Sequence, residues 1–542
     1  MTAAPTPDAI PDHARTLVSK HSTSFYNLGE EQWIPVELLT GELSLYGFEQ
    51  TLRDAHLIKD IALTNPLEKA VILRYLIALT YVVHSYQPTE SLWEAVVSGD
   101  SGLPLDGVNR TIERVKSYWN LLDPDRPFMQ SPSVPEWLGS KPGESVELDH
   151  PASLLPFAPR RSNEAWFGKE LIENQIKNEK LPLALLMRHF CMTPGNEGKA
   201  SGTGKSSQSG GLFLVGQRNL SHFFRQSCNL AATLASNLTE RGVDAVTTDA
   251  VLFWEASLEP AKNSNDWLYL YTSSPVTAYL IPGSQEDTSP MRVRRVPYPL
   301  DSEVMKRVGV LARLQDPHTL RIKKKGTTGG DLKDWSFFYA DPSATQAQNL
   351  FSFYRNCAES LDLGSGVFNT TNLRYKAPSV RTDLLTLSLD VGGTSTGARL
   401  ESVSLMPLNP APYLLSDSDA KSIRAILNLV ASSQDSIRTK TAHHVKVAMG
   451  LQGAPLPKAV AKKLEIRLWL ALNEELQTLI NEALVGKVIK EIPMETKRRW
   501  VDLSIAVFED LCSQYKSSAN STTQFYRSKA SLRRSLWKKI MS

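Results

Sequence analysis

The hydrophobic pattern near the N-terminus predicts strands and then a helix. Residues 33–36 and 43–45 have the character of two short strands, joined by a turn at Thr40-Gly41. Residues 48–61 place apolar side chains at steps of three and four, which predicts a helix.

A longer helix is predicted from residue 65 onward. Asn65-Pro66-Leu67-Glu68 is typical of a helix start, because asparagine is a good cap and proline fits the first helical position. The residues to about Tyr86 are apolar nearly all round, so this helix is expected to be buried. Another helix is expected over residues 107–121. Residues 150–163 contain three prolines, which preclude a helix there.

The middle of the chain mixes both kinds of pattern. Helices are predicted over residues 181–192 and 220–238. Strands are predicted over residues 212–215, 251–254, 267–272, 276–281 and 384–390. Basic runs occur at residues 292–295 and 321–325, and the glycines after the second run favour a hairpin tip over a binding patch.

Beyond Pro412 the pattern becomes one of long amphipathic helices. One apolar stripe at steps of three and four comprises Ala461, Leu464, Leu468, Leu472, Leu476, Leu479 and Ala483. Comparable segments span residues 417–433, 437–450, 494–516 and 522–540. A bundle of about four long helices would bury these stripes. The fold class predicted is therefore α+β, with a large mixed α/β N-terminal domain followed by a C-terminal four-helix bundle.

The length of 542 residues favours more than one domain. We expect a disordered leader over residues 1–24, a mixed α+β domain over 25–410 and a helical bundle over 411–542. The four cysteines lie far apart without a Cys-x-x-Cys pair, which argues against a zinc ribbon or a disulfide framework and fits a reducing cytoplasm. No signal peptide is visible, and the longest apolar stretch is too short to span a membrane.

The net charge of +3 conceals an asymmetry along the chain. Residues 411–542 carry 21 Lys and Arg against 12 Asp and Glu, a balance of +9, so the first 410 residues carry about −6. The last predicted helix carries Arg527, Lys529, Arg533, Arg534, Lys538 and Lys539. This distribution indicates either an anionic partner for the C-terminal part or a well-solvated surface.

Residues 194–211 form a loop of small polar residues, with six glycines, four serines and two lysines. Glycine leaves its backbone N–H uncovered, so such a loop can press its main chain against a phosphate or a groove, with Lys199 and Lys205 supplying charge. The same composition is equally typical of a flexible surface linker.

The end of this loop resembles a nucleotide-binding Walker A sequence, but its spacing is wrong. The pattern requires glycine at the position of Lys199, and Gly198 is one residue away. An apolar helix enters the loop and a strand leaves it, the reverse of the order that a P-loop requires. His443-His444 are adjacent on a helix and point in different directions, and no histidine has metal-ligand spacing. We therefore expect no catalytic residues and no metal.

Two further segments could contact nucleic acid. The strand over residues 384–390 ends in a second small-residue loop, residues 391–399. The proline-rich segment places Phe157 beside Arg160 and Arg161, a pairing of stacking and charge that suits single-stranded nucleic acid. A packed Phe157 beside solvated arginines is the alternative.

Several of these segments together resemble one protein family. Trp33-Ile34-Pro35-Val36, Leu43-Ser44-Leu45, Leu52-Arg53-Asp54-Ala55-His56 and the helix over residues 71–78 are similar to the N-terminus of the CasA family, the large subunit of type I-E CRISPR Cascade. Further matches in the family's order are Arg126-Pro127-Phe128-Met129-Gln130, the glycine loop, Phe253-Trp254-Glu255, Asp316-Pro317-His318 and a closing helical bundle. The resemblance covers most of residues 25–542, and the ordered set is more specific than any one motif.

The resemblance implies contacts to duplex DNA. In the family a glycine loop and a lysine enter the minor groove beside a protospacer-adjacent motif (PAM), and a wedge in a hairpin splits the first base pair. The implied groove contacts are Gly195, Gly198, Lys199, Gly202, Gly204 and Lys205, with Lys306 as a weak match for the groove lysine. The implied wedge residues are Thr394, Thr396, Gly397, Ala398 and Arg399. The family's Asn-Gln-Ala wedge is not present, and Thr396-Gly397-Ala398 in its place is shorter in reach.

The resemblance also implies the partners. Phe157, Arg160 and Arg161 occupy the place of the loop that docks on the 5′ handle of the guide RNA. The other expected partners are double-stranded target DNA, the other Cascade subunits and a helicase-nuclease effector, with no membrane and no cofactor. Some family members carry a cysteine cluster that this chain lacks, so zinc is not expected. The function expected is a non-catalytic DNA-inspection subunit; the alternatives are a structural protein-interaction subunit and, more distantly, a nucleotide hydrolase.

Overall fold

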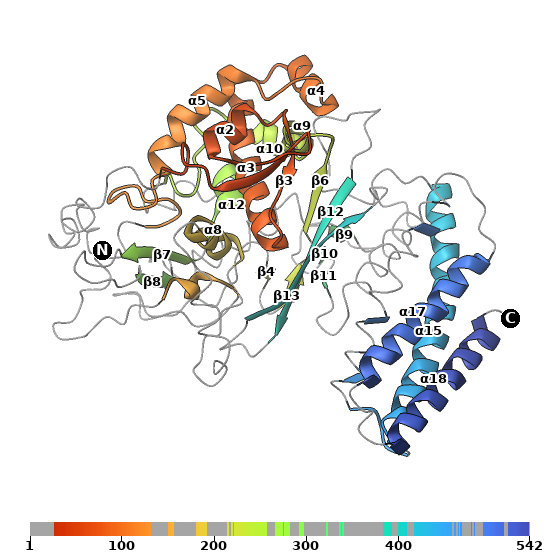
Figure 1. The fold of residues 1–542 in the computed structure, drawn as a ribbon. Helices are drawn as coiled ribbons and strands as arrows, with labels where there is room; N and C mark the ends of the chain where they lie inside the picture. The colour runs from red at the N-terminus through yellow and green to blue at the C-terminus, as the bar shows by residue number, and fades with distance from the viewer. Residues whose placement is uncertain are drawn as a thin grey trace, which may run out of the picture. The chain divides into compact units, whose positions relative to one another are not determined.

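A computed structural model gives the fold of the chain (Figure 1). It describes residues 27–131, 150–156, 180–191, 214–215, 218–220, 222–256, 266–274, 276–281, 292–297, 321–323, 335–337, 339–340, 383–392, 399–408, 417–451, 453–457, single positions between 460 and 482, 491–513 and 519–540. The chain divides into two compact units, one of residues 1–320 with 370–407 and one of residues 321–369 with 408–542.

The first unit begins with a three-stranded antiparallel sheet of order β2-β1-β3. Its strands are β1 (Ile34–Leu38), β2 (Leu43–Tyr46) and β3 (Ile58–Ile61). Between β1 and β2, Gly41 has a φ of 85°, a conformation that favours glycine over other residues. The two strands and the turn predicted here are confirmed.

The helix predicted over residues 48–61 is only half right. Helix α2 (Phe48–Arg53) ends after six residues, and the chain turns into β3, which pairs with β1. In Ile58-Lys59-Asp60-Ile61 the two isoleucines are buried and Lys59 is exposed. The apolar spacing at this point fits a short strand as well as a helix, and pairing with β1 decides for the strand.

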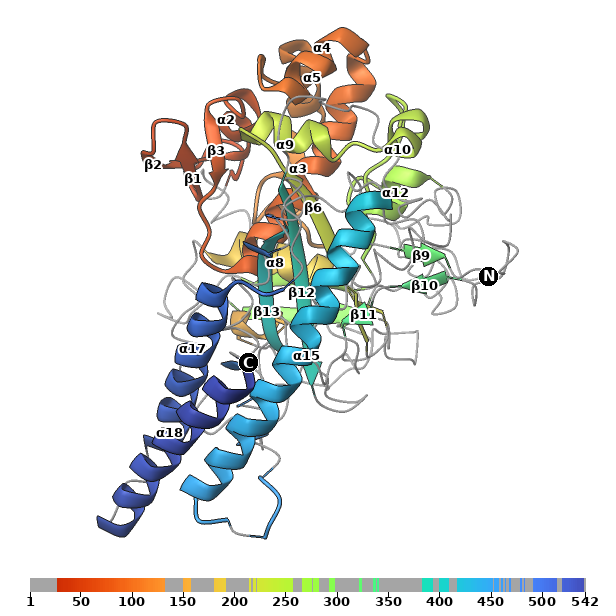
Figure 2. The ribbon, with the colours of Figure 1, turned by 90° about the vertical axis from the view of Figure 1, so that its right-hand side faces the viewer.

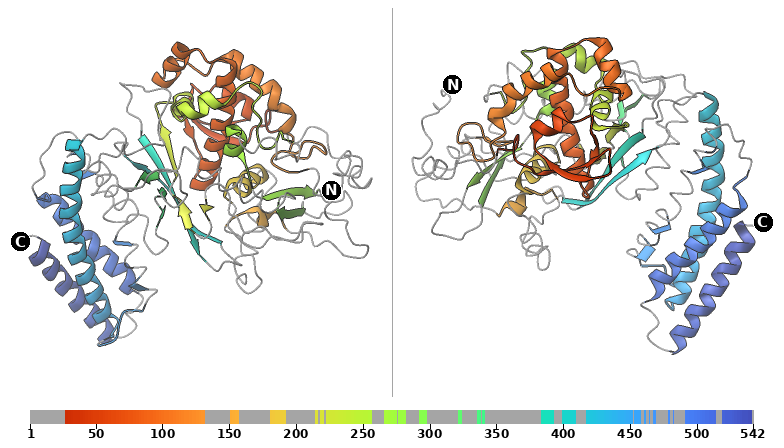
Figure 3. Two further views of the ribbon diagram at one scale, coloured as in Figure 1. Left: turned by 180° about the vertical axis from the view of Figure 1, so that it is seen from behind. Right: turned by 45° about the horizontal axis from the view of Figure 1, so that its top comes forward.

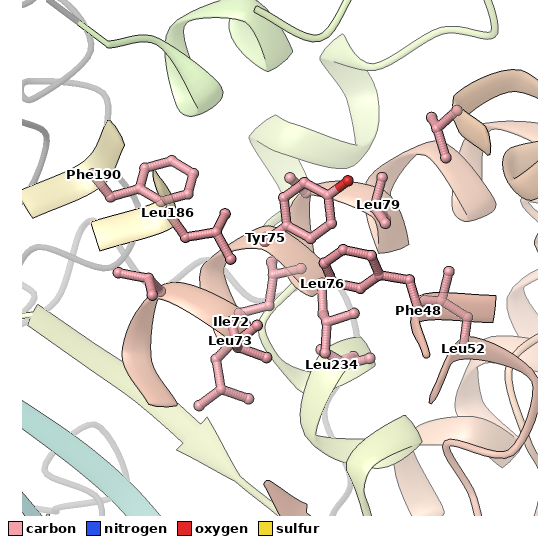
Figure 4. Close-up of a cluster of buried hydrophobic side chains, with 14 of the residues drawn as sticks. Phe48, Leu52, Ile72, Leu73, Tyr75, Leu76, Leu79, Leu186, Phe190 and Leu234 are labelled. Carbon is pink, nitrogen blue, oxygen red and sulfur yellow. The ribbon is translucent and has the colours of Figure 1, made fainter. Parts of the chain in front are cut away.

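Helix α3 (Pro66–Tyr86) lies at the centre of the core of this unit (Figure 4). The side chain of Asn65 accepts a hydrogen bond from the N–H of Leu67 at 3.0 Å, as expected for a cap. The helix is buried on all sides, including Arg74 and Thr80. Its predicted start, end and burial are confirmed.

Other helices of the first unit surround α3. They are α4 (Glu90–Ser98), α5 (Leu105–Val115), α8 (Leu181–Cys191), α9 (Leu230–Ser236), α10 (Glu240–Ala245) and α12 (Trp267–Thr272). Of these, α5, α8, α9, α10 and α12 all contact α3. The helix predicted over residues 107–121 starts two residues earlier, as α5, and ends in the single turn η2 (Lys116–Tyr118). The apolar helix predicted before the glycine loop is confirmed as α8.

Two other predictions in this unit are wrong. The helix expected over residues 220–238 begins only at Leu230, because the chain before it pairs as β5 (Arg218–Leu220) and β6 (His222–Gln226). The strand expected over residues 267–272 is the helix α12, since the side chain of Asp266 caps it by accepting from the N–H groups of Leu268 and Tyr269. Its six residues are all buried, so no polar face revealed the helical period.

The remaining strands of the first unit form small antiparallel pairs. β7 (Val276–Ile281), predicted as a strand, pairs with β8 (Arg292–Pro297). β4 (Leu214–Val215) pairs with β5. Residues 251–254, predicted as a strand, instead run into a turn beginning at Phe253. Within the proline-rich segment a single 3₁₀ turn, η3 (Pro151–Leu154), forms where no helix was expected, because proline fits its first position.

The second unit contains three long helices, α15 (Asp417–Ala448), α17 (Met494–Cys512) and α18 (Ala519–Ile540), which pack alongside one another (Figures 2 and 3). The two segments predicted over residues 417–433 and 437–450 are one continuous helix. Described positions between 460 and 482 are also helical, and Leu464, Leu468 and Leu479 of the predicted apolar stripe are buried. The short pair of β9 (Arg321–Lys323) and β10 (Trp335–Phe337) belongs to this unit and places the basic run at the start of a hairpin. The predicted α+β class with C-terminal helices is confirmed.

Candidate nucleic-acid interface

The structure leaves most of the predicted contact residues outside its described part. These are Phe157, Arg160, Arg161, Gly195, Gly198, Lys199, Gly202, Gly204, Lys205, Lys306, Thr394, Thr396, Gly397 and Ala398. Arg399 is described as the first residue of β13 (Arg399–Leu408). The structure describes the helices and strands from which these segments leave and to which they return.

The glycine loop leaves from the end of α8, which is fixed in the core. All residues of α8 are buried, and its last turn is held by side chains that bind backbone carbonyls. The Arg188 guanidinium donates to the carbonyl of Thr277 at 3.2–3.3 Å. His189 Nε2 lies 2.7 Å from the carbonyl of Thr272, and Ser274 Oγ donates to the carbonyl of His189 at 2.9 Å. The point of departure of the loop is thus a rigid part of the core.

Two arginines, Arg74 and Arg188, are buried around this end of α8, next to His189. The guanidinium of Arg74, on α3, donates to the carbonyl of Tyr271 at 2.9 Å and lies 4.0 Å from the centre of its ring. Burial lowers the pKa of His189 to about 4, opposed by its hydrogen bond to Thr272 and assisted by Arg74. At neutral pH His189 is therefore uncharged and donates its Nε2–H to the carbonyl of Thr272. Burial also raises the pKa of the Cys191 thiol, which is inert as a nucleophile.

On its far side the glycine loop leads into strands that lie beside β12 (Asp383–Gly392), whose strand prediction is confirmed. β4 starts at Leu214 and pairs with β5, which lies next to β12. β6 follows and pairs antiparallel with β12, from Asp383 opposite Gln226 to Leu387 opposite His222 (Figure 1). The glycine loop is thus continuous with strands on one side of β12.

The second small-residue loop is the connection of a hairpin that includes β12. After Leu387, β12 continues five residues to Gly392, about 17 Å at the usual rise of a strand. Its other neighbour in the sheet is β13. Residues 393–398 are too few to cross over between parallel strands, so β12 and β13 run antiparallel. The end of β12 that bears this loop extends beyond the start of β6.

The segment that contains Phe157, Arg160 and Arg161 is attached to α8 at both ends. It follows η3, which packs against α8, and it returns to the start of α8 at Leu181. At its beginning the side chain of His150 accepts a hydrogen bond from the N–H of Ala152, and Leu154 is fully buried. One buried helix therefore carries this segment at one end and the glycine loop at the other.

Two of the segments that resemble the family, residues 126–130 and 253–255, make packing contacts in the core. The side-chain oxygen of Gln130 accepts from the N–H of Leu280 at 2.6 Å, and its nitrogen donates to the carbonyl of Leu121 at 2.7 Å. Phe128, in the same motif, is buried against Phe48 and Tyr75. These contacts fix the chain between β7 and the core.

Glu255, in the second of these motifs, forms a bidentate ion pair with Arg114 on α5, at 2.9 and 2.6 Å. Next to it, the ring of Trp254 lies 5.2 Å from that of Tyr75 on α3. These contacts join the motif to two core helices. Both motifs therefore contribute to the packing of the core.

Helix α18 carries aromatic residues that the sequence interpretation missed. Tyr526 and Trp537 are 57% and 42% exposed, and helical spacing puts them on one face with Arg533. The helix has six cations and no carboxylate. Lys529 pairs with Glu509 and Arg533 with Asp502, both on α17. Tyr526, Arg533 and Trp537, at steps of seven and four within a basic helix, are a signal that could have been found.

The described residues hold no group of three side chains that could bind a metal ion. None of the helices in the described part is long and apolar enough to cross a membrane.

Comparison with known proteins gives the family. A sequence model of the family described as CRISPR-associated protein Cse1 matches residues 27–501. CRISPR-associated protein CasA/Cse1 of Thermus thermophilus is 30% identical over 203 residues. This match spans 36% of the present chain and only 38% of that relative.

Solved structures of similar fold extend over nearly the whole chain. Thermobifida fusca Cse1 matches with a TM-score of 0.59 at 15% identity, covering 95% of this chain and 98% of that one. Thermus thermophilus CasA (Cse1) matches with a TM-score of 0.56 at 17% identity, covering 95% and 99%. A chain of a CRISPR RNA-guided surveillance complex matches with a TM-score of 0.53 at 15% identity, covering 94% and 99%. These likenesses show a shared fold, and the family match from residue 27 to residue 501 shows that the chain belongs to the family of CRISPR-associated protein Cse1, also called CasA.

Proposed function

We propose that this chain is the non-catalytic DNA-inspection subunit of an RNA-guided antiviral surveillance complex in the cytoplasm. In this role it recognises a PAM in duplex DNA, helps to start strand separation and recruits a helicase-nuclease. Membership of the Cse1 family supports the assignment, as does the fold shared with a chain of an RNA-guided surveillance complex. The domain division proposed with it is a leader over residues 1–24, a mixed domain over 25–410 and a bundle over 411–542.

The proposal rests on one observation: both loops are joined to β12 or to strands that lie beside it. The glycine loop leads into strands beside β12, and β12 carries the second small-residue loop at its end. With Gly202, Gly204 and Lys205 in the minor groove, the second loop would meet the same duplex a short distance away. The minor groove distinguishes little beyond A·T from G·C, so a loop of glycines reads it permissively. Most sequence specificity is then left to pairing with the guide RNA.

The guide RNA is the proposed partner of Phe157, Arg160 and Arg161. Their segment is attached to α8 at both ends, so a docked 5′ handle would be held against the helix from which the glycine loop departs. RNA docking and DNA inspection would then share one rigid support.

Helix α18 is the proposed electrostatic element. Arg527, Arg534 and Lys538 form no ion pair with another described residue. Beside them, the exposed Tyr526 and Trp537 can stack on bases. We propose that this face follows the displaced strand or the recognised duplex, with affinity that falls as salt rises.

The test is duplex binding by the assembled complex with a glycine-loop variant. Gly202→Val, Gly204→Val and Lys205→Ala together should leave assembly intact and weaken binding of PAM-bearing duplexes about tenfold or more, since a side chain prevents close approach of the backbone. Lys116→Ala is the matched control, because Lys116 is an exposed lysine paired only locally with Glu113. Mobility shifts with duplexes that differ in the flanking trinucleotide give the readout.

Unchanged duplex binding by the triple variant would contradict the groove contact and favour the alternative, a structural subunit without direct DNA readout. A chain that fails to join the guide-bearing complex at all would contradict the whole assignment.

A further inference from the structure

The small N-terminal sheet presents an apolar face to solvent. Four leucines on or beside its strands are strongly exposed: Leu39 at 53%, Leu43 at 71%, Leu45 at 48% and Leu57 at 47%. An antiparallel sheet with one face on the core normally directs polar side chains outward. Contiguous exposed leucines of this kind are typical of an interaction site.

Strand register places Leu43 and Leu45 on the outer face of the sheet. Leu43 lies opposite Glu37 and Leu45 opposite Pro35, while the alternate residues Ile34 and Tyr46 are buried on the inner face. The N–H of Leu39 donates to the carbonyl of Leu57 at 2.9 Å, so the ends of β1 and β3 bring these two residues side by side. We call Leu39, Leu43, Leu45 and Leu57 the leucine face.

Among the strands that the structure describes, β2 has a neighbour on one side only and is an edge strand. The sheet order is β2-β1-β3, and Figure 2 shows β2 as the outermost strand. The opposite edge is covered: β3 contacts α9, and the side chain of Gln226 donates to Asp60 at 3.0 Å. Every second residue of an edge strand points its N–H and C=O away from the sheet, where another strand can pair with them.

The surroundings of the leucine face are acidic. Residues 27–61 include seven Asp and Glu and only two cations, Arg53 and Lys59. Two of these carboxylates are paired, Glu37 with Lys59 at 2.6 Å and Asp60 with Lys69 of α3, so the excess of negative charge comes from the other five. Glu42 directly precedes β2, and Glu30 and Glu31 are exposed. Burial raises the pKa of Tyr46 on β2, and the nearby charges of Asp54 and Glu42 raise it further.

We propose that the edge of β2 and the leucine face dock an extended segment of another protein, with alternating apolar residues and basic ends, by strand addition. The backbone of that segment would pair with β2, its apolar side chains would cover Leu43 and Leu45, and its Lys or Arg residues would meet Glu42 and its acidic neighbours. A second copy of this chain fits less well, because its β2 edge has the same acidic surroundings and no basic residue next to the strand. This surface is independent of the proposed DNA contacts.

The experiment uses the full chain and a labelled probe peptide, acetyl-Lys-Leu-Thr-Val-Thr-Leu-Lys-amide, followed by fluorescence anisotropy. The peptide should bind saturably, and L43S with L45S should weaken it about tenfold, as loss of apolar contact predicts. L92S is the matched control, since Leu92 on α4 is 41% exposed and lies outside this sheet. E42K should weaken the lysine peptide and strengthen the same peptide with glutamate at both ends.

A second peptide, N-methylated on alternate residues, tests the pairing of backbones. Strand addition predicts that methyl groups on the amides facing β2 abolish binding, whereas methylation of the other amides does not. Equal binding by L43S/L45S and unmodified chain, or indifference to N-methylation, would overturn the proposal. So would a concentration-dependent dimer that L43S/L45S abolishes, which would assign the face to a second copy. Displacement of the probe by a peptide of residues 1–26 would assign it to this chain's own N-terminal segment and would overturn the proposal equally.

Discussion

Helices α3 and α18 have almost the same length, 21 and 22 residues, and opposite surroundings. In α3 sixteen residues are buried, and they cover every side of the helix. In α18 the buried positions are Phe525, Ser528, Leu532, Leu536 and Ile540, a single stripe at steps of three and four. The same backbone therefore forms the centre of a core in one unit and one wall of a bundle in the other.

This contrast between α3 and α18 predicts where substitutions should change stability and where they should change binding. Each apolar side chain of α3 is packed on all sides, so its loss leaves a cavity. The exposed side chains of α18 contribute little to folding, which leaves their charges available for binding. Stability measurements should therefore report on α3, and salt-dependent binding on α18.

The largest expected effect is on α3. Leu76→Ala should lower the free energy of unfolding of the first unit by about 2–5 kcal/mol, since Leu76 is fully buried among the residues of Figure 4. Urea unfolding followed by tryptophan fluorescence gives the measurement. Leu92→Ala, at a half-exposed position of α4, is the control and should cost far less. An equal cost at both positions would contradict the contrast.

The next effect concerns pH and His189, which packs close to α3. Burial holds the pKa of His189 at about 4, against about 6.5 in an unfolded chain. Between these values the unfolded chain binds more protons, so stability rises with pH. The free energy of unfolding is therefore highest above pH 6.5 as far as His189 is concerned. As the pH falls towards 4, protonation of His189 in the unfolded chain lowers it by roughly 3 kcal/mol at most.

Unfolding by urea at several pH values tests this dependence. His189→Gln keeps a side-chain donor without the titration, and it should flatten the profile between pH 4 and 6.5. His443→Gln on α15 is the control, because His443 is exposed and belongs to the other unit. A slope that persists in His189→Gln would place its origin in other groups.

The smallest effect on stability is expected in α18. Replacing Arg527, Arg534 and Lys538 by alanine should change the free energy of unfolding by less than about 0.5 kcal/mol for each residue, as is usual for exposed positions. In the assembled complex the same variant should bind DNA with a weaker salt dependence, the log–log slope falling by about 0.9 for each phosphate that the protein no longer neutralises. DNA-binding titrations at salt concentrations between about 50 and 200 mM measure this slope.

A control variant separates paired from unpaired cations of α18. Lys529→Ala and Arg533→Ala remove side chains that are already paired with Glu509 and Asp502. They should alter the salt slope less than the triple variant does. A slope unchanged in both variants would contradict a role of α18 in binding DNA.

The same pair of helices explains how much of the fold the sequence predicts. α3 was predicted correctly because Asn65 and Pro66 mark its start and its apolar run is too long for a strand. Short buried elements lack such signals. In Trp267–Thr272 every residue is buried, and only the Asp266 cap distinguishes the helix from a strand. Ile58–Ile61 becomes a strand through pairing with β1, a partner about twenty residues away that local spacing cannot reveal.

The candidate interface was predictable in a different sense. Composition identified the glycine loop and the second small-residue loop, but no local pattern relates two segments almost 190 residues apart. Their relation follows from the pairing of β6 with β12, and the helix predicted over residues 220–238 had concealed β6. The contacts of Gly202, Gly204, Lys205 and the wedge residues stay predictions.

The burial of α3 also has a consequence for synthesis on the ribosome. The guanidinium of Arg74 binds the carbonyl of Tyr271, 197 residues further along the chain. At about 5–20 residues per second, roughly 10–40 s pass between the synthesis of these two residues. During that interval the apolar helix of 21 residues still lacks α12, and for part of it the other helices that cover it. The nascent N-terminal unit is thus expected to be a client of ribosome-associated chaperones, and its yield in cells should respond to their depletion before that of shorter-range folds.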